Sequence, residues 1–254
     1  MKRLILILLA LSVTGLSVGA HSGKQAEIAQ NAALEGAWSY TDGDVEHTAV
    51  FVDGYFSHAI FNVKKQEFMG TRGGPYEWKD GKLSVIWQYD TEKVAQEVKA
   101  EDWIGKTGTF DLQVVAEGTM SNNLSGSAKT WRQLDKNGGV ISGVWRMTGR
   151  KTDDNISTTP LRERRTLKIL TGTRFQWVAI NIANGQFSGT GGGRYTFENG
   201  KYTEHIEFFS RDNTRVGMAL SFNGEMVDGS WHHSGLSSAG NPIYEIWGKL
   251  ENKF

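Results

Sequence analysis

The segment Phe187-Ser-Gly-Thr-Gly-Gly-Gly-Arg-Tyr-Thr-Phe-Glu-Asn-Gly-Lys201 has a counterpart earlier in the chain, Phe68-Met-Gly-Thr-Arg-Gly-Gly-Pro-Tyr-Glu-Trp-Lys-Asp-Gly-Lys82. The two segments lie 119 residues apart (187 − 68 = 119) and share Phe, Gly, Thr, Gly, Gly, Tyr, Gly and Lys at equivalent positions. A match of this density indicates a tandem duplication. Each half of the chain therefore serves as a control for the other.

The composition narrows the class of protein. A chain of 254 residues that contains a repeat is long enough for two small domains. The formal net charge is zero, so no basic field favours nucleic acid. Glycine is abundant at 31 residues and proline is rare at 3, which suits short strands joined by tight turns. The absence of cysteine excludes disulfides and cysteine-ligated metal sites.

Alternating apolar and polar residues predict strands through both halves, with turn pairs such as Asp53-Gly54, Asp80-Gly81 and Asn199-Gly200 between them. The pattern is interrupted at Asp90 to Glu101, where we expect a short helical insertion, and at Thr152 to Pro160, where we expect a polar loop. About eight consecutive hairpin strands per half predict an all-β fold of two tandem eight-stranded up-and-down barrels.

A Gly-x-Trp motif stands at the start of each half, at Gly36-Ala-Trp38 and Gly143-Val-Trp145. With the hairpin run, this pattern resembles the lipocalin-like (calycin) barrels, and in particular a group of uncharacterised secreted bacterial proteins with lipocalin-like domains. The resemblance implies that a basic side chain of the last strand covers each tryptophan, Arg132 over Trp38 and Lys249 over Trp145. It implies no particular ligand, because the family binds very varied ones.

The N-terminus predicts export. Met1-Lys-Arg3, a short apolar run and small residues up to Ala20 form the pattern of a signal peptide. We expect a signal peptide at 1–20, a linker at 21–33, barrel 1 at 34–138 and barrel 2 at 139–254. The mature protein is expected to be secreted or periplasmic, with no membrane insertion after signal cleavage and no nucleic acid partner.

The repeat also predicts which side chains face inward. Leu83, Val85, Trp87 and Tyr89 share one face of a strand, and Glu204 stands where its counterpart has Val85. A carboxylate at an inward position needs a partner or solvent. Two interpretations follow: Glu204 pairs with an inward basic residue such as Arg165, or it contacts a ligand.

We expect a small hydrophobic or amphipathic ligand in a partly apolar pocket of barrel 2, because the strands there gather aromatic residues with a few polar groups. Barrel 1 is expected to have a drier interior. The predicted ligand-binding residues are Arg165, Trp177, Glu204, Trp231, His233 and Glu245.

The sequence also offers candidate sites for phosphate, metal and haem. Gly189 to Gly193 could cradle phosphate, but strand pattern on both sides favours a bend in a barrel strand. A metal held by Glu204, His233 and Glu245, or a haem on one histidine, is disfavoured, so no cofactor is predicted. Two alternative functions stay open: an interaction or structural module with packed barrels, and an acid–base enzyme that uses Glu204 and His233.

Overall fold

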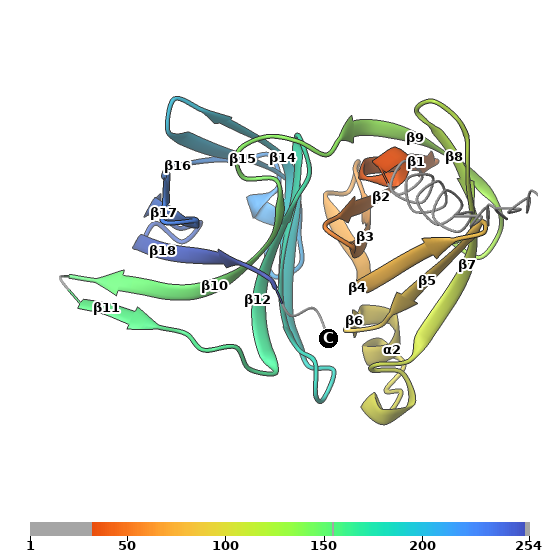
Figure 1. Ribbon diagram of the computed structural model, residues 1–254, viewed down its shortest axis with the longest axis horizontal. Coiled ribbons are helices and arrows are strands. Elements are labelled where there is room, and N and C mark those ends of the chain that lie inside the picture. The colour runs from red at the N-terminus through yellow and green to blue at the C-terminus, as the bar shows by residue number, and fades with distance from the viewer. Residues whose placement is uncertain (1–31, 154, 252–254) are drawn as a thin grey trace, which may run out of the picture. The chain divides into compact units, whose positions relative to one another are not determined.

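The computed structural model describes residues 32–153 and 155–251 (Figure 1). These residues form two antiparallel sheets of nine strands, and in each sheet eight strands close into a barrel while the ninth pairs at one edge. Neighbours in each barrel are consecutive in sequence, so the predicted tandem of up-and-down barrels is confirmed. The predicted signal peptide lies outside the described residues.

Barrel 1 closes through pairing of its first and last strands. Its strands are β1 (Gly36–Asp42), β2 (Val45–Val52), β3 (Tyr55–Asn62), β4 (Glu67–Lys79), β5 (Lys82–Ile86), β7 (Thr107–Ala116), β8 (Thr119–Asn122) and β9 (Lys129–Lys136). The two-residue strand β6 (Tyr89–Asp90) pairs with β4. The expected helical insertion contains α2 (Thr91–Ala95), which Asp90 caps by accepting from two backbone N–H groups, and the 3-10 turn η1 (Ala100–Asp102).

Barrel 2 closes in the same way, through β10 and β18. Its strands are β10 (Gly143–Thr152), β12 (Arg164–Leu170), β13 (Arg174–Asn181), β14 (Phe187–Glu198), β15 (Lys201–Phe209), β16 (Ala219–Val227), β17 (Ser230–Leu236) and β18 (Pro242–Lys249). The expected polar loop contains an unpredicted strand, β11 (Asn155–Thr158), which pairs with β10. The 3-10 turn η2 (Asn213–Arg215) precedes β16, which begins at Ala219.

The glycine-rich segment that reveals the repeat forms the strands β4 and β14. Gly193 has a φ of +152° and stands where the pairing of β14 with β15 shifts its register. A Cβ atom on Gly193 would collide with the carbonyl oxygen of His205. These glycines therefore let a long strand bend around the barrel, as expected for strand glycines.

The Gly-x-Trp tryptophans close the base of each barrel. The indole Nε1 groups of Trp38 and Trp145 each donate to a backbone carbonyl four residues earlier, at 2.8 Å. The Nζ atom of Lys249 lies 4.5 Å from the ring centroid of Trp145, as predicted. Arg132 was assigned wrongly to Trp38. A bulge shifts β9 by one residue, so Gln133 pairs with Trp38 and Arg132 lies beside the next residue of β1.

The two barrels pack on each other through equivalent faces. Gln176 of β13 accepts a hydrogen bond from Ser57 of β3 at 2.5 Å, and these residues occupy equivalent positions in the repeat (176 − 57 = 119). The amide of Gln176 also donates to Thr71 and Thr190, which are equivalent to each other. An apolar cluster surrounds this network, and its buried members are Ala37, Val50, Val52, Tyr55, Tyr89, Val144, Leu167, Ile169, Val178, Ile180 and Leu250.

Candidate functional site in barrel 2

Glu204 faces the interior of barrel 2 and forms a buried ion pair. Its Oε1 atom lies 2.7 Å from Nζ of Lys168, and each of the two side chains is 6% exposed. The hydroxyl of Tyr202 donates to the same oxygen at 2.9 Å. The inward position predicted for Glu204 is therefore correct, but its basic partner is Lys168 rather than Arg165.

Aromatic rings enclose the cation of this pair. The Nζ atom of Lys168 lies 4.7 Å from the ring centroid of Tyr202, and three more rings lie within 6 Å of it, those of Phe222, Trp231 and Trp247. Cation–π attraction and the carboxylate together compensate the ammonium group for lost hydration. The ion pair and the aromatic side chains thus fill the part of the interior where the sequence predicts a ligand.

His233 and Glu245 stand side by side next to this pair. Nδ1 of His233 lies 3.4 Å from Oε2 of Glu245, an ion-pair distance whose geometry does not meet that of a hydrogen bond. Burial lowers the pKa of His233, and the charge of Lys168 lowers it further. Burial would raise the pKa of Glu245, but His233 and Lys168 outweigh it, so the net direction is downward. Glu245 is thus held ionised in the barrel wall.

Arg165 lies on the opposite face of its strand. It pairs in register with Ile180, and Leu167 and Ile169 on the same face of β12 belong to the apolar cluster between the barrels. Burial lowers the pKa of Arg165. The prediction that Arg165 faces inward is wrong, because both faces of β12 are buried and alternation alone does not tell the interior from the interface.

Trp177 faces inward, where it packs against the interior cluster of barrel 2. Its ring lies 5.5 Å from the ring of Phe209 and 5.8 Å from the guanidinium carbon of Arg211. Four residues of the predicted set lie together. Glu204 is the partner of Lys168, Trp231 is one of the rings around Lys168, and His233 and Glu245 lie beside them. Their role in contacting a ligand stays a prediction.

Barrel 1 is apolar where barrel 2 has its ion pair, since Ala49 and Val85 stand in place of Lys168 and Glu204. Elsewhere its interior is more polar than expected. Nδ1 of His47 lies 3.1 Å from Nε2 of the fully buried His58. Burial lowers the pKa of His47 to about 4 and places the pKa of His58 well below its ordinary value. The sequence held a signal for this pair, because His58 stands two residues after Phe56 and therefore on the same inward face of β3.

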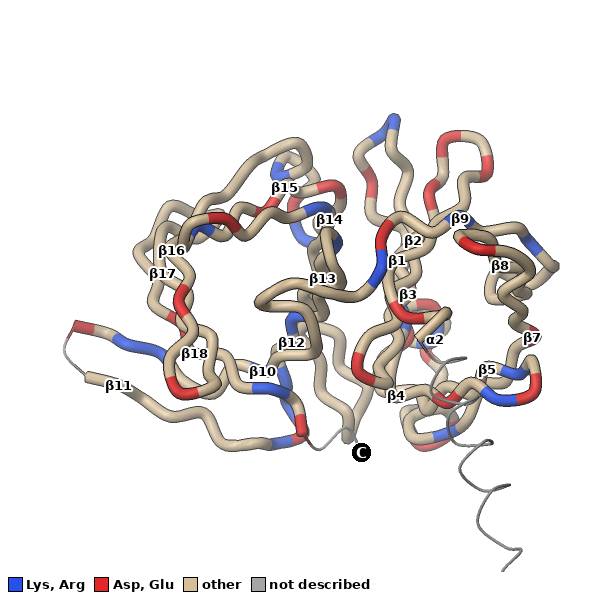
Figure 2. The backbone as a smooth tube through the Cα atoms, turned by 45° about the horizontal axis from the view of Figure 1, so that its top comes forward, with Lys and Arg blue, Asp and Glu red and all other residues tan. Residues whose placement is uncertain are grey.

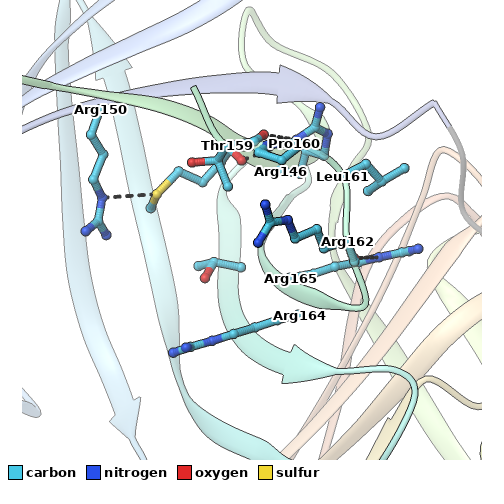
Figure 3. Close-up of a pocket in the computed structure, with 10 residues that line it drawn as sticks. Arg146, Arg150, Thr159, Pro160, Leu161, Arg162, Arg164 and Arg165 are labelled. Atoms are coloured by element: carbon cyan, nitrogen blue, oxygen red, sulfur yellow. Dashed lines mark hydrogen bonds between the residues drawn. The ribbon is translucent and has the colours of Figure 1, made fainter. Parts of the chain in front are cut away.

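A pocket of about 260 Å³ opens at one end of barrel 2, between β10 and β12 (Figure 3). The two strands pair as far as Arg146 and Leu167, and beyond this point β10 continues alongside β11 instead. The segment before β12 lies across the gap. The residues that line the pocket are Arg146, Met147, Arg150, Thr159, Pro160, Leu161, Arg162, Arg164, Arg165 and Thr166. Apart from Arg165, none was predicted, because the site depends on the separation of two strands.

Hydrogen bonds hold the rim of this pocket in place. Nη1 of Arg146 donates to the carbonyl of Thr159 at 2.9 Å, and the N–H of Thr159 donates to the carbonyl of Thr148 at 2.7 Å. On the other side, the carbonyl of Glu163 accepts from the N–H of Ile182 at 2.9 Å. The segment is fastened to β10 and to the residue that follows the end of β13, so the pocket is pre-formed.

The described residues contain neither a metal-binding cluster nor a membrane-spanning helix. Across residues 32–153 and 155–251, no group of three or more His, Asp or Glu side chains is placed to hold a metal ion. No helix within the same residues has the length and apolar character needed to cross a membrane.

Each half has the closed up-and-down topology and the buried Gly-x-Trp indole that the resemblance to lipocalin-like barrels implies. No protein-family model matches the chain, and no curated protein matches it. A lipocalin-like protein from Bacteroides uniformis is a similar solved structure, with 19% identity and a TM-score of 0.28 over 40% of this chain and 99% of that one. An uncharacterized protein from Bacteroides eggerthii is also similar, with 21% identity and a TM-score of 0.27 over 39% and 98% of the two chains.

Proposed function

We propose that the protein binds a small ligand in the pocket between β10 and β12, at the open end of barrel 2. The pocket itself carries this proposal. Its volume of about 260 Å³ would hold roughly nine water molecules at their share of liquid volume, which suits a compact metabolite-sized group. The predicted interior position, by contrast, is occupied by the Lys168–Glu204 ion pair.

An insertion that only the second repeat carries builds this pocket. The offset between the repeats is 107 residues at the Gly-x-Trp motifs (143 − 36 = 107) and 119 residues from β12 to β15 (164 − 45 = 119). The additional residues supply β11 and the segment that crosses the gap. Barrel 1 instead joins β1 directly to β2 by a tight turn after Asp42. Loops that are added to a conserved scaffold commonly carry binding sites, which favours a role for this one.

The lining of the pocket suits an amphipathic ligand. Met147, Pro160 and Leu161 offer apolar surface, while arginine side chains and Thr166 offer hydrogen-bond donors. This combination agrees with the class of ligand that the sequence predicts. We propose in addition that the protein acts outside the cytoplasm, because residues 1–20 have the pattern of a signal peptide.

Native mass spectrometry of the protein, purified without denaturation, tests the proposal with two matched variants. Thr166→Trp fills the pocket, and Thr203→Trp adds the same bulk to β15, where Thr203 alternates with the inward-facing Tyr202 and Glu204. We expect a small-molecule adduct on the wild type and on Thr203→Trp, and its loss in Thr166→Trp. An adduct that persists in Thr166→Trp would place the ligand elsewhere.

A further inference from the structure

We propose that the pocket between β10 and β12 selects a ligand with an oxyanion group, a phosphate or a carboxylate. The inference rests on the proposed function and adds the chemical class of the ligand.

The lining is strongly basic. Five of its ten residues are arginines and none is acidic, although the whole chain has a formal net charge of zero. In Figure 2, Lys and Arg positions mark β10 and the start of β12. Like charges gathered in a partly enclosed site raise the local concentration of anions and stabilise them once bound.

Two of the arginines have uncommitted guanidinium groups. Arg146 is engaged with the carbonyl of Thr159, Arg150 lies 3.5 Å from Glu245, and Arg165 donates to the carbonyl of Arg162 at 3.2 Å. Within the described part of the chain, the guanidinium groups of Arg162 and Arg164 form no hydrogen bond or ion pair. A guanidinium group presents a planar fork of N–H donors that matches the geometry of carboxylate and phosphate oxygens.

The positive charge belongs to the second repeat alone. In barrel 1 the positions equivalent to Arg164 and Arg165 are Val45 and Glu46 (164 − 119 = 45 and 165 − 119 = 46). The position equivalent to Arg146 is Ser39 (146 − 107 = 39). The arginines therefore occur in the repeat that carries the insertion, whereas barrel 1 has other residues at the equivalent positions.

Arg162 and Arg164 are among the residues that line this pocket (Figure 3), and their substitution tests the inference. Inorganic phosphate and citrate are titrated separately into the full-length protein by isothermal calorimetry at low ionic strength. The test variant is Arg162→Gln/Arg164→Gln. The control is Lys129→Gln/Arg132→Gln on β9 of barrel 1, which removes the same charge from another surface. Circular dichroism verifies that both variants are folded.

We expect saturable binding of at least one anion, weakened about tenfold or more in the test variant and unchanged in the control, because two charge-assisted contacts are lost. The stronger titrant tells phosphate from carboxylate ligands. The inference is overturned if neither anion binds saturably, or if both variants weaken binding equally through net charge. A native adduct that survives in Arg162→Gln/Arg164→Gln would contradict the anion class and leave the proposed small-ligand binding intact.

Discussion

Lys168 and Glu204 form a buried ion pair inside barrel 2 at positions where barrel 1 has Ala49 and Val85. The same barrel scaffold therefore tolerates either an apolar pair or a charged pair at this level. A buried ion pair is weak evidence for stability, because the loss of hydration of the two charges opposes their attraction. We therefore expect the pair to add little net stability, although Glu204 also accepts a hydrogen bond from Tyr202.

Single and double substitutions test this view of the ion pair. Glu204→Leu leaves the ammonium group of Lys168 unpaired in an apolar cage, and we expect a loss of about 3–5 kcal/mol in the free energy of unfolding. Lys168→Met strands the carboxylate and should cost a similar amount. The double variant Lys168→Met/Glu204→Leu should be within about 1 kcal/mol of the wild type, or more stable. Urea denaturation measures all three, and additive losses in the double variant would refute the account.

Acid should destabilise the protein through its buried histidines. Burial lowers the pKa of His58 and of His233 below the ordinary value of 6.5. The unfolded chain then binds more protons than the folded one, so stability falls as the pH drops below about 6.5. One fully buried histidine contributes a slope of up to about 1.4 kcal/mol per pH unit.

The variant His58→Phe isolates this effect. It should flatten the pH dependence of the unfolding free energy between pH 7.5 and pH 5, since Phe cannot take up a proton. The exposed His205 provides the control, because His205→Gln should leave the slope unchanged. An equal slope in the wild type and in His58→Phe would show that this histidine does not govern the acid response.

The polar network between the barrels should contribute measurably to stability. Gln176 is 3% exposed and connects Ser57 of barrel 1 with Thr190 of barrel 2. Gln176→Leu removes the acceptor of the buried Ser57 hydroxyl and the donor to Thr71 and Thr190, and we expect a loss of about 1–3 kcal/mol in unfolding free energy. The exposed Gln113 on β7 is the control, and Gln113→Leu should change stability by less than about 0.5 kcal/mol. Thermal or urea unfolding that shows the same small change in both variants would contradict this role.

Lys249 offers a further test, because barrel 1 supplies its natural replacement. Its ammonium group lies over Trp145 and donates to the carbonyl of Ser142 at 2.6 Å, whereas the equivalent position in barrel 1 is Gln133. We expect Lys249→Gln to lower the unfolding free energy by about 1 kcal/mol. The reverse change, Gln133→Lys, should be neutral or stabilising. Chemical denaturation measures the unfolding free energy of both variants, and an unchanged value for Lys249→Gln would contradict the prediction.

The fold could be predicted from the sequence because the same strand and turn patterns occur in both halves of the chain. Turn pairs and alternation recurred in both halves, and the Gly-x-Trp motifs marked the first strand of each half. The inward position of Glu204 followed from comparison with Val85. The partner of Glu204 did not, since β12 is buried on both faces and Arg165 and Lys168 differ only in which face they occupy.

The pocket could not be predicted because it depends on geometry between elements. Alternation describes residues within a strand, and nothing in it indicates that β10 leaves β12 after Arg146. The cluster Arg162, Arg164 and Arg165 was visible in the sequence. Its role became visible only with β11, which pairs with β10 where β12 no longer does, beside these residues.

A crystal structure of the wild-type protein, purified without denaturation, tests the central claim most directly. The account predicts electron density for a small molecule in the pocket between β10 and β12, in contact with Arg162 and Arg164. Density for a ligand inside the barrel beside Trp231 and Trp247, or a pocket that contains ordered water alone, would contradict it.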